Sequence, residues 1–293
     1  MTEPFDVTSP EKEGVPSGPG AGDRREPGRF AFGRNWASFL RVLDEERIAE
    51  AERSLTAMLG AERIAGATFL DVGSGSGLFS LAAMRLGARR VHSFDFDPAS
   101  VACTQELRRR YFPEASHWTI ARASALDGDY VRSLGTWNVV YSWGVLHHTG
   151  GMWDALGQVA GLVDASGVLF ISIYNDQGPI SAGWRAVKQF YNRGAMAKAA
   201  VVSAFVPYFV GRGLVVDLAR RRSPLTRYRD YRRTRGMSMV HDWIDWLGGF
   251  PFEVAKPEEV FHFYRQRGFT LEKLTTCGGR LGCNEFVFHR STS

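Results

Sequence analysis

The 293-residue sequence predicts an α/β protein built on a doubly wound, mostly parallel β-sheet. Two observations predict this fold class. Short apolar segments alternate with helical patterns at close intervals from Thr68 to Tyr174, as in parallel strands joined by helices. The first apolar segment also runs directly into a glycine cluster, which is typical of a tight turn between a strand and a helix in such sheets.

Hydrophobic periodicity then places the elements in order. A helical pattern over 36–59 comes before the sheet and ends at Gly60. Helices are expected at 78–86 and 98–111, the second with Pro98 at its start, where a missing N–H costs little. Five strands are expected, at 68–72, 90–95, 118–123, 137–142 and 168–174.

After Tyr174 the alternation stops, and the pattern over 184–245 is mostly helical, aromatic and basic. A further helix at 257–266 and two strands at 269–275 and 285–289 predict a final antiparallel hairpin. We therefore divide the chain into four parts: a disordered tail (1–29), a ligand-binding domain that contains the parallel strands (30–175), an inserted helical cap (176–256), and a final helix and hairpin that complete the sheet (257–293).

The tail assignment follows from composition. Residues 2–28 are rich in Pro, Gly and charge and cannot bury enough apolar area to offset the entropy of ordering. They also lack the basic start and apolar stretch of a signal peptide.

The composition of the whole chain excludes several classes. Hydrophobic residues make up 44% and charged residues 23%, which excludes a wholly disordered, a collagen-like or a multi-span membrane protein. A net charge of +5 is weak evidence for a nucleic-acid partner. Three cysteines (Cys103, Cys277 and Cys283) are too few for a disulfide framework, so we expect a reducing, cytoplasmic setting.

The glycine cluster predicts a ligand site. Asp71 ends the first strand, and the loop after it holds three glycines: Gly73, Gly75 and Gly77. Glycines let the backbone turn sharply and approach a ligand closely, and the following helix offers unpaired N–H groups. Asp95 ends the next strand, where an acid can accept both hydroxyls of a ribose. The dinucleotide pattern Gly-x-Gly-x-x-Gly fails here, because Leu78 or Ser80 occupies its last position, so an NAD enzyme is disfavoured.

These motifs resemble those of class I S-adenosylmethionine-dependent methyltransferases, over about a third of the chain. The matching segments are 69–77, 91–98, 123–125 and 137–148, and Asn138 stands where the family usually has Asp. The ending Leu-His-His of the fourth segment is most similar to ubiquinone-type and natural-product O-methyltransferases. The resemblance implies a methyltransferase enzyme with the class I fold, S-adenosylmethionine as cofactor, and the following cofactor contacts: Asp71, Gly73, Ser74, Gly75, Gly77, Asp95, Phe96, Ser124, Ala125 and Trp143.

In many members of that superfamily a segment before the first helix folds over the donor. Phe32, Asn35 and Trp36 lie in the corresponding segment here, so we expect them either to form a lid that excludes water or to pack plainly against the domain. Asn35 and Trp36 are counted with the cofactor contacts.

Methyl transfer mainly needs alignment and a dry site, and it needs a base only where an acceptor hydroxyl must lose its proton. His147 and His148 end the fourth strand at the ligand-binding edge, so either can be that base, or both can pack locally. Tyr174 ends the fifth strand at the same edge and can orient an acceptor. His241 and Asp245 lie four residues apart in the cap, on one helix face, where they can support the cap, orient the acceptor hydroxyl, act as a His–Asp base pair or supply two metal ligands. No third ligand has recognisable spacing, so no metal is predicted.

The sequence of the cap is compatible with more than one binding partner. Residues 199–219 are strongly apolar, but Pro207, Arg212 and Asp217 argue against a spanning helix, so we expect a buried cap helix. The alternative is peripheral membrane contact through 199–235, because eight arginines follow at 220–235. That run can equally bind RNA or an acidic substrate, or form a solvated face.

The favoured function is O-methylation of a hydroxyl on a small apolar or aromatic acceptor, such as a secondary metabolite or a quinone-like molecule. The alternatives are an RNA-modifying methyltransferase that uses 220–235, and N- or C-methylation of a small molecule or peptide. No separate RNA-binding module is visible in the sequence. The sequence is also compatible with a homodimer.

Overall fold

The computed structural model describes residues 30, 33–221, 223, 243 and 246–291, and only the main chain of residues 34, 35, 37 and 38. The proposed tail, Phe32, His241, Asp245 and most of the arginine run lie outside the described residues.

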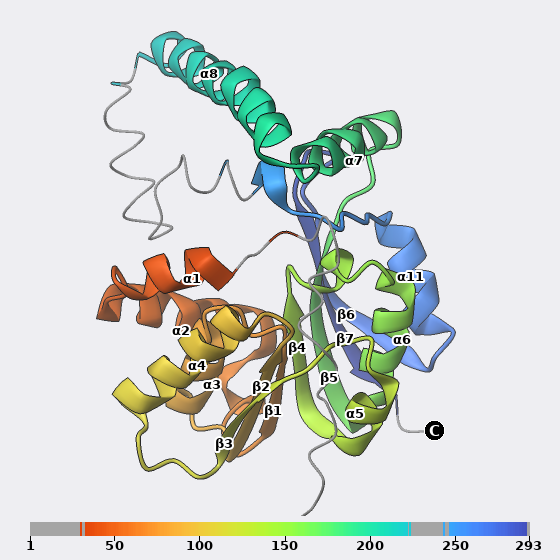
Figure 1. The fold of residues 1–293 in the computed structure, drawn as a ribbon. Helices are drawn as coiled ribbons and strands as arrows, with labels where there is room; N and C mark the ends of the chain where they lie inside the picture. The colour runs from red at the N-terminus through yellow and green to blue at the C-terminus, as the bar shows by residue number, and fades with distance from the viewer. Residues whose placement is uncertain (1–29, 31–32, 222, 224–242, 244–245, 292–293) are drawn as a thin grey trace, which may run out of the picture.

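A seven-stranded sheet forms the centre of the molecule, in the order β3-β2-β1-β4-β5-β7-β6 (Figure 1). The first five strands are parallel to one another, and β7 runs antiparallel between β5 and β6. This confirms the predicted mostly parallel sheet with its C-terminal hairpin. The strands are β1 (Thr68–Val72), β2 (Arg90–Asp95), β3 (Trp118–Arg122), β4 (Trp137–Trp143), β5 (Val163–Tyr174), β6 (Phe269–Thr275) and β7 (Cys283–Arg290).

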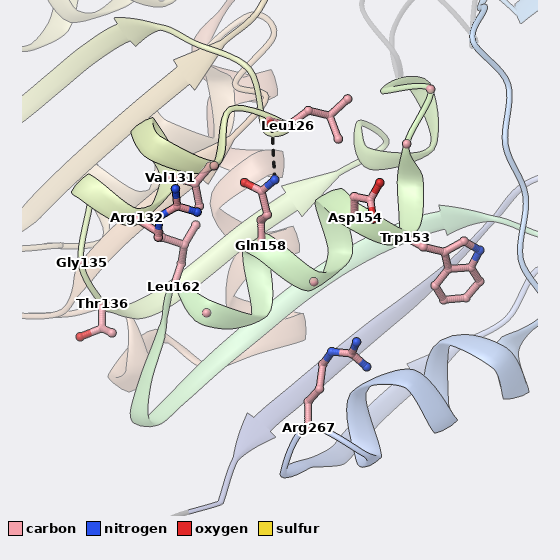
Figure 2. A pocket seen from close by; sticks show the side chains of 15 residues that line it. Leu126, Val131, Arg132, Gly135, Thr136, Trp153, Asp154, Gln158, Leu162 and Arg267 are labelled. Atoms are coloured by element: carbon pink, nitrogen blue, oxygen red, sulfur yellow. Dashed lines mark hydrogen bonds between the residues drawn. The ribbon is translucent and has the colours of Figure 1, made fainter.

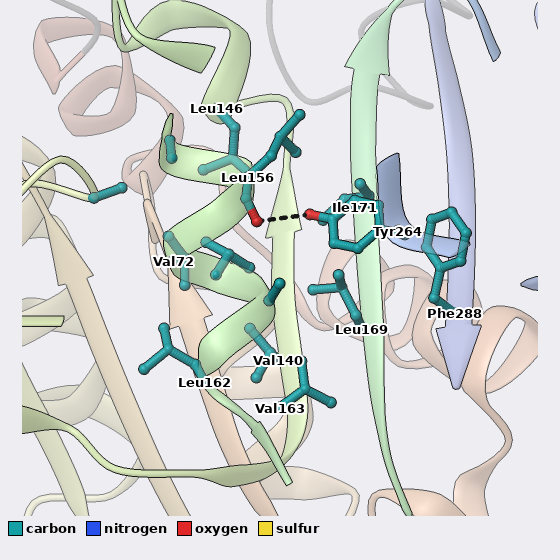
Figure 3. Close-up of a cluster of buried hydrophobic side chains, with 14 of the residues drawn as sticks. Val72, Val140, Leu146, Leu156, Leu162, Val163, Leu169, Ile171, Tyr264 and Phe288 are labelled. Atoms are coloured by element: carbon teal, nitrogen blue, oxygen red, sulfur yellow. Dashed lines mark hydrogen bonds between the residues drawn. The ribbon is translucent and has the colours of Figure 1, made fainter. Parts of the chain in front are cut away.

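Helices cover both faces of the sheet (Figure 1). One face carries α2 (Glu45–Leu59), α3 (Leu78–Arg85) and α4 (Pro98–Tyr111), packed on a core that includes Phe69, Val91 and Tyr141. The other face carries α5 (Gly128–Ser133), α6 (Met152–Gly161) and α11 (Pro257–Arg265). Figure 3 shows this second core, in which the Tyr264 hydroxyl donates to the Leu156 carbonyl at 3.2 Å and joins α11 to α6.

The single helix expected over 36–59 is wrong, because the chain forms two helices there: α1 (Gly33–Leu40) and α2. Asp44 separates them. Its backbone is extended and its carboxylate accepts from the Arg47 N–H, so it caps the start of α2. The break lets α1 turn onto α4, where the Gly33 N–H donates to Asp97 at 2.8 Å.

The segment 176–256 contains α7 (Pro179–Tyr191) and α8 (Ala195–Ala219). Both lie beyond the carboxyl ends of the central strands, and α8 projects away from the body (Figure 1). A small apolar cluster around Tyr191, Val201 and Leu247 joins them to the returning chain. The expectation that this apolar helix is buried is wrong: among its residues only Val201 and Asp217 are buried.

Candidate active site

The glycine loop between β1 and α3 is tied to the end of β2. The Phe94 carbonyl accepts from the N–H groups of Gly73 at 2.8 Å and Ser74 at 3.1 Å. Gly73 has a φ of +81°, and a Cβ on it would stand 2.3 Å from the Val145 side chain. The position therefore needs glycine both for its left-handed backbone and for the close approach of the β4 end.

Asp95 lies beside this loop, as the spacing predicts. Its carboxylate accepts from the Gly75 N–H at 2.9 Å and from the Asp97 N–H at 2.8 Å. Phe96 follows it with 39% of its surface exposed. An acid, an exposed ring and a bend of main-chain N–H groups thus meet at the carboxyl edge of β1 and β2, where open α/β sheets bind their ligands.

Trp36 contacts the same loop from α1. A Cβ on Gly75 would lie 3.2 Å from the Trp36 indole, so any larger residue at this left-handed position would press on the ring. The structure thereby brings the expected lid residue onto the glycine loop. Asn35 belongs to α1, and its side chain lies outside the described residues.

Asp71 is placed differently from the other predicted contacts. It is buried, and the Ser80 hydroxyl donates to it. Ser80 in turn pairs with Ser93 at 2.7 Å, and the Trp118 indole N–H donates to Ser93 at 2.9 Å. Burial raises the pKa of Asp71 to about 7. This network holds β1, β2, β3 and α3 together under the loop, which gives Asp71 a positioning role. A direct contact with cofactor stays a prediction.

The remaining predicted cofactor residues lie in three places. Ser74 and Gly77 are held against α4 by Thr104: its hydroxyl lies 3.0 Å from that of Ser74, and a Cβ on Gly77 would meet it at 2.8 Å. Ser124 and Ala125 follow β3 at the same edge, with the Ser124 hydroxyl accepting from the Leu126 N–H.

Trp143 points elsewhere. Its indole N–H donates to Glu285 of β7 at 2.7 Å, across β5, so its part in cofactor binding stays a prediction. Asn138, the departure from the family pattern, lies at the opposite end of β4 and accepts from the Thr68 N–H.

A second cluster lies at the carboxyl ends of β4 and β5. The rings of His147 and His148 are 4.5 Å apart, and Tyr174 lies 4.1 Å from the first and 5.5 Å from the second. The structure thus brings together the three residues predicted from different strand ends. Phe252, from the chain returning out of the cap, lies 5.2 Å from Tyr174.

The two histidines differ in their bonding. The Nδ1 of His148 lies 2.6 Å from the Pro251 carbonyl oxygen. Because a carbonyl can only accept, Nδ1 donates, and the neutral ring then carries its basic lone pair on Nε2. His147 is fully buried, and neither ring nitrogen makes a hydrogen bond of ordinary geometry among the described residues, although the Ser172 backbone faces the ring. Burial, with the nearby His148 and Lys188, lowers the pKa of His147 well below its ordinary value.

Lys188 on α7 belongs to this cluster and was missed from the sequence. It is fully buried, its Nζ donates to the Trp246 carbonyl, and it lies 4.9 Å from the rings of Trp246 and Phe252. Burial lowers the pKa of Lys188 to about 7. The available signal was its spacing: Trp184, Lys188 and Tyr191 share one helix face, on which a lysine stands among aromatic residues.

The returning chain fastens the cap to this edge. The Glu253 N–H donates to the His147 carbonyl at 2.9 Å, and the Ala255 N–H donates to the Tyr174 carbonyl at 3.0 Å. The Glu253 carboxylate accepts from the N–H groups of Gly150 and Met152 at the start of α6. Residues 250–255 therefore hold the returning end of the cap segment against the two histidines.

A cavity of about 870 Å³ lies outside this region, between α5, α6 and Arg267 (Figure 2). None of the predicted site residues lines it. Within the described part of the chain, no three His, Cys, Asp or Glu side chains gather as a metal site would require.

The sequence comparisons with known proteins find a family match that covers the glycine loop and Asp95. Residues 53–117 match the family model of ribosomal protein L11 methyltransferase (PrmA). The L11 methyltransferase of Anoxybacillus flavithermus is 34% identical over 86 residues, 25% of this chain and 28% of that protein. That of Xanthomonas campestris is 33% identical over 112 residues, 38% of this chain and 33% of that protein. The chain thus spans about a third or less of these relatives.

Solved structures share the fold. An O-methyltransferase family protein from Burkholderia thailandensis aligns over 92% of this chain and 66% of its own, with a TM-score of 0.51 and 15% identity. Magnesium protoporphyrin IX methyltransferase from Synechocystis with bound SAH aligns over 88% and 95%, with a TM-score of 0.50 and 15% identity. The predicted class I methyltransferase fold is confirmed.

Proposed function

We propose that this chain, a class I methyltransferase by fold, transfers the methyl group of S-adenosylmethionine to a hydroxyl of a small apolar or aromatic acceptor. The observation that carries the proposal is the arrangement of His148 beside Tyr174, at the same sheet edge as the glycine loop and under an aromatic cap. The family match at 53–117 includes the loop and Asp95 and ends before His147, so it bears on the donor and leaves the acceptor open.

The residues at the donor edge fit S-adenosylmethionine. Gly73 and Gly75 keep the loop free of Cβ atoms, so main-chain groups can approach the cofactor closely. Asp95 lies where it can accept the ribose hydroxyls, Phe96 offers an exposed ring to the adenine, and Trp36 covers the loop. When bound, the cofactor supplies an already activated methyl group, so the protein's task is alignment and exclusion of water.

His148, Tyr174 and His147 of the second cluster have different roles toward the acceptor. When bound, S-adenosylmethionine would give up its methyl group and leave as S-adenosylhomocysteine. His148 would accept the hydroxyl proton of the acceptor on Nε2, and the Pro251 carbonyl holds the ring in the tautomer that this needs. Tyr174 orients the acceptor. His147, neutral and buried beneath them, acts as a positioning residue.

The aromatic cap supports an apolar acceptor. Ring contacts run from Tyr174 to Phe252, and Lys188 bridges Phe252 to Trp246, which meets Trp184 edge to face at 4.1 Å between ring centroids. An aromatic cluster of this kind favours aromatic or aliphatic groups over RNA or a charged peptide. The three free cysteines are consistent with a reducing compartment, so we place the reaction in the cytoplasm.

The cofactor is tested by calorimetric titration of the full chain with S-adenosylmethionine and S-adenosylhomocysteine. Asp95→Ala removes the ribose acceptor and is expected to weaken binding by about 100-fold, since hydrogen bonds to charged groups contribute about 1.5–3 kcal/mol each. Asp129→Ala, which removes an exposed acid paired with Arg132, is the matched control. Wild-type affinity in Asp95→Ala would overturn the cofactor assignment.

The acceptor is tested with radiolabelled cofactor on catechols and hydroquinones with alkyl tails, beside ribosomal protein L11 and transfer RNA. We expect label on the phenolic acceptors. His148→Gln is expected to lower turnover at least about 100-fold with donor affinity unchanged, as for loss of a general base. His262→Gln, at an exposed histidine on α11, is the control. Label on protein or RNA alone would replace the small-molecule proposal, and normal turnover in His148→Gln would remove the base.

A further inference from the structure

Helix α8 exposes apolar side chains along its whole length, in contrast to every core helix of this fold. Met196 is 89% exposed at its start, Val215 is 65% and Leu218 is 63% exposed near its end. Exposed contiguous apolar surface of this kind marks an interaction site.

The exposed apolar residues share one face. Val210, Leu214 and Leu218 follow at intervals of four, and Tyr208 and Val215 at an interval of seven, so they lie on one side of the helix. The opposite side carries Phe205 and Phe209, which contact Trp184 at 5.3 Å and Trp246 at 6.0 Å. α8 therefore contacts the protein through Phe205 and Phe209 on one face, and the large apolar side chains of the other face are exposed.

The outward face carries no charge. At 3.6 residues per turn, Lys198 and Arg212 fall on the side of Phe205, and Asp217 falls at the border of the outward face. Twelve residues make up the uncharged face: Met196, Ala197, Ala200, Ser203, Ala204, Pro207, Tyr208, Val210, Gly211, Leu214, Val215 and Leu218.

Length and composition alone would let α8 cross a membrane, with a mean hydropathy of 1.7, and only 11% of its apolar window is buried. A core helix passes the same test but is buried, and a signal sequence lies at the N-terminus, so neither explains α8. A crossing would pull Phe209 off Trp246 and place Arg212 and Asp217 in hydrocarbon. The geometry instead leaves the uncharged face available to one leaflet while Phe205 and Phe209 stay packed on the protein.

Charges around the helix favour an anionic surface. Residues 193–221, all described, carry five basic side chains against the single acid Asp217: Arg193, Lys198, Arg212, Arg220 and Arg221. Basic residues beside an apolar helix face attract the headgroups of anionic lipids.

We propose that α8 docks this chain on the anionic face of a lipid bilayer, with the uncharged face defined above inserted at the boundary of headgroups and acyl chains. The inference goes beyond the methyltransferase activity and holds whatever the acceptor is. A second copy of this chain is the competing occupant of the same face.

Sedimentation with vesicles tests the proposal on the full chain. The vesicles contain equal parts of phosphatidylglycerol and phosphatidylcholine, or phosphatidylcholine alone. The chain is expected to sediment with the anionic vesicles and, since surface charges are screened by salt, less so as salt rises. The double variant Val215→Asp/Leu218→Asp is expected to lower the partition coefficient more than tenfold by placing two acids in the inserted face.

The control variant Leu274→Asp/Leu281→Asp makes the same change at exposed residues of the β6–β7 hairpin and is expected to sediment as wild type. Thermal unfolding and S-adenosylhomocysteine binding report whether each variant stays folded. Absence of vesicle binding by the wild type, or equal binding by the α8 variant, overturns the proposal. Light scattering that shows a dimer which the α8 variant breaks, without vesicle binding, assigns the face to a second copy.

Discussion

The two halves of the candidate site lie on one sheet edge but are built in different ways. The donor half, at the ends of β1 and β2, consists of main-chain turns and one acid, and Gly75 and Asp95 are only 20 residues apart. The acceptor half, at the ends of β4 and β5, depends on residues far apart in sequence: His148 contacts Pro251 across 103 residues, and Lys188 contacts Trp246 across 58.

The family match covers the donor half and ends before the acceptor half. A loop fixed by glycine backbone geometry tolerates few sequences, so it appears in the family match at 53–117. The acceptor half is held together by aromatic and buried polar groups, some of which come from the cap. Substitutions in the cap can therefore change the acceptor half. The acceptor half is therefore the place to look for specificity, and each half predicts its own response to substitution.

The largest expected effect is at Gly73. Gly73→Val combines the strain of a left-handed backbone, about 1–2 kcal/mol, with overpacking against Val145, about 1–3 kcal/mol. We expect the free energy of unfolding to fall by about 4 kcal/mol and donor binding to be lost, measured by urea denaturation and calorimetry.

Gly66→Val is the matched control for that change. Gly66 has a similar φ of +72°, but a Cβ there meets nothing within 4 Å, so only the strain is added. We expect it to cost about 1–2 kcal/mol and to leave donor affinity unchanged. Equal losses at the two glycines would mean that the close approach to Val145 is unimportant.

The same contrast explains what the sequence could predict. β1, β2, β6 and α4 are found at the residues predicted, because each has strong local periodicity and a Gly, Pro or acid at its end. The break before α2 was missed, since Asp44 caps a helix inside a continuous apolar pattern. The exposure of α8 was missed because an apolar run predicts burial only where a partner surface exists, and sequence does not show that surface.

Among the site residues, Asp95 and the loop follow from spacing, and Trp36 follows from the resemblance to the methyltransferase superfamily. Lys188 could not be predicted in the same way. A lysine is normally exposed, and its burial depends on Trp246 and Phe252, which lie about 60 residues further along the chain.

The next largest effect concerns Lys188 and stability as a function of pH. The folded pKa is lowered to about 7 from an ordinary value of 10.5. Between these values the unfolded chain binds a proton that the folded chain does not, so stability rises with pH, by at most about 1.4 kcal/mol per pH unit. Lys188→Met removes this dependence. The stability of wild type relative to the variant should rise by about 2.5 kcal/mol from about pH 7.5 to about pH 9.5.

Lys273→Met is the control for that titration, because Lys273 also donates to a backbone carbonyl, that of Ala57, but is exposed. Its stability curve should stay parallel to wild type over the same pH range. A parallel curve for Lys188→Met as well would show that Lys188 is not buried as a neutral amine.

The smallest effect is at Trp36, and its sign decides what the residue does. As a cover on the loop, Trp36 excludes water from bound donor, so Trp36→Ala should lower donor affinity about tenfold, close to 1.4 kcal/mol. Trp36→Phe keeps most of the apolar cover and should lose little. Trp153→Ala, at an exposed tryptophan on α6, controls for the loss of a large ring. Tighter donor binding in Trp36→Ala would mean that the indole occupies the donor's own place over Gly75. α1 would then have to move before the donor enters, and the donor half would be gated by its own N-terminal helix.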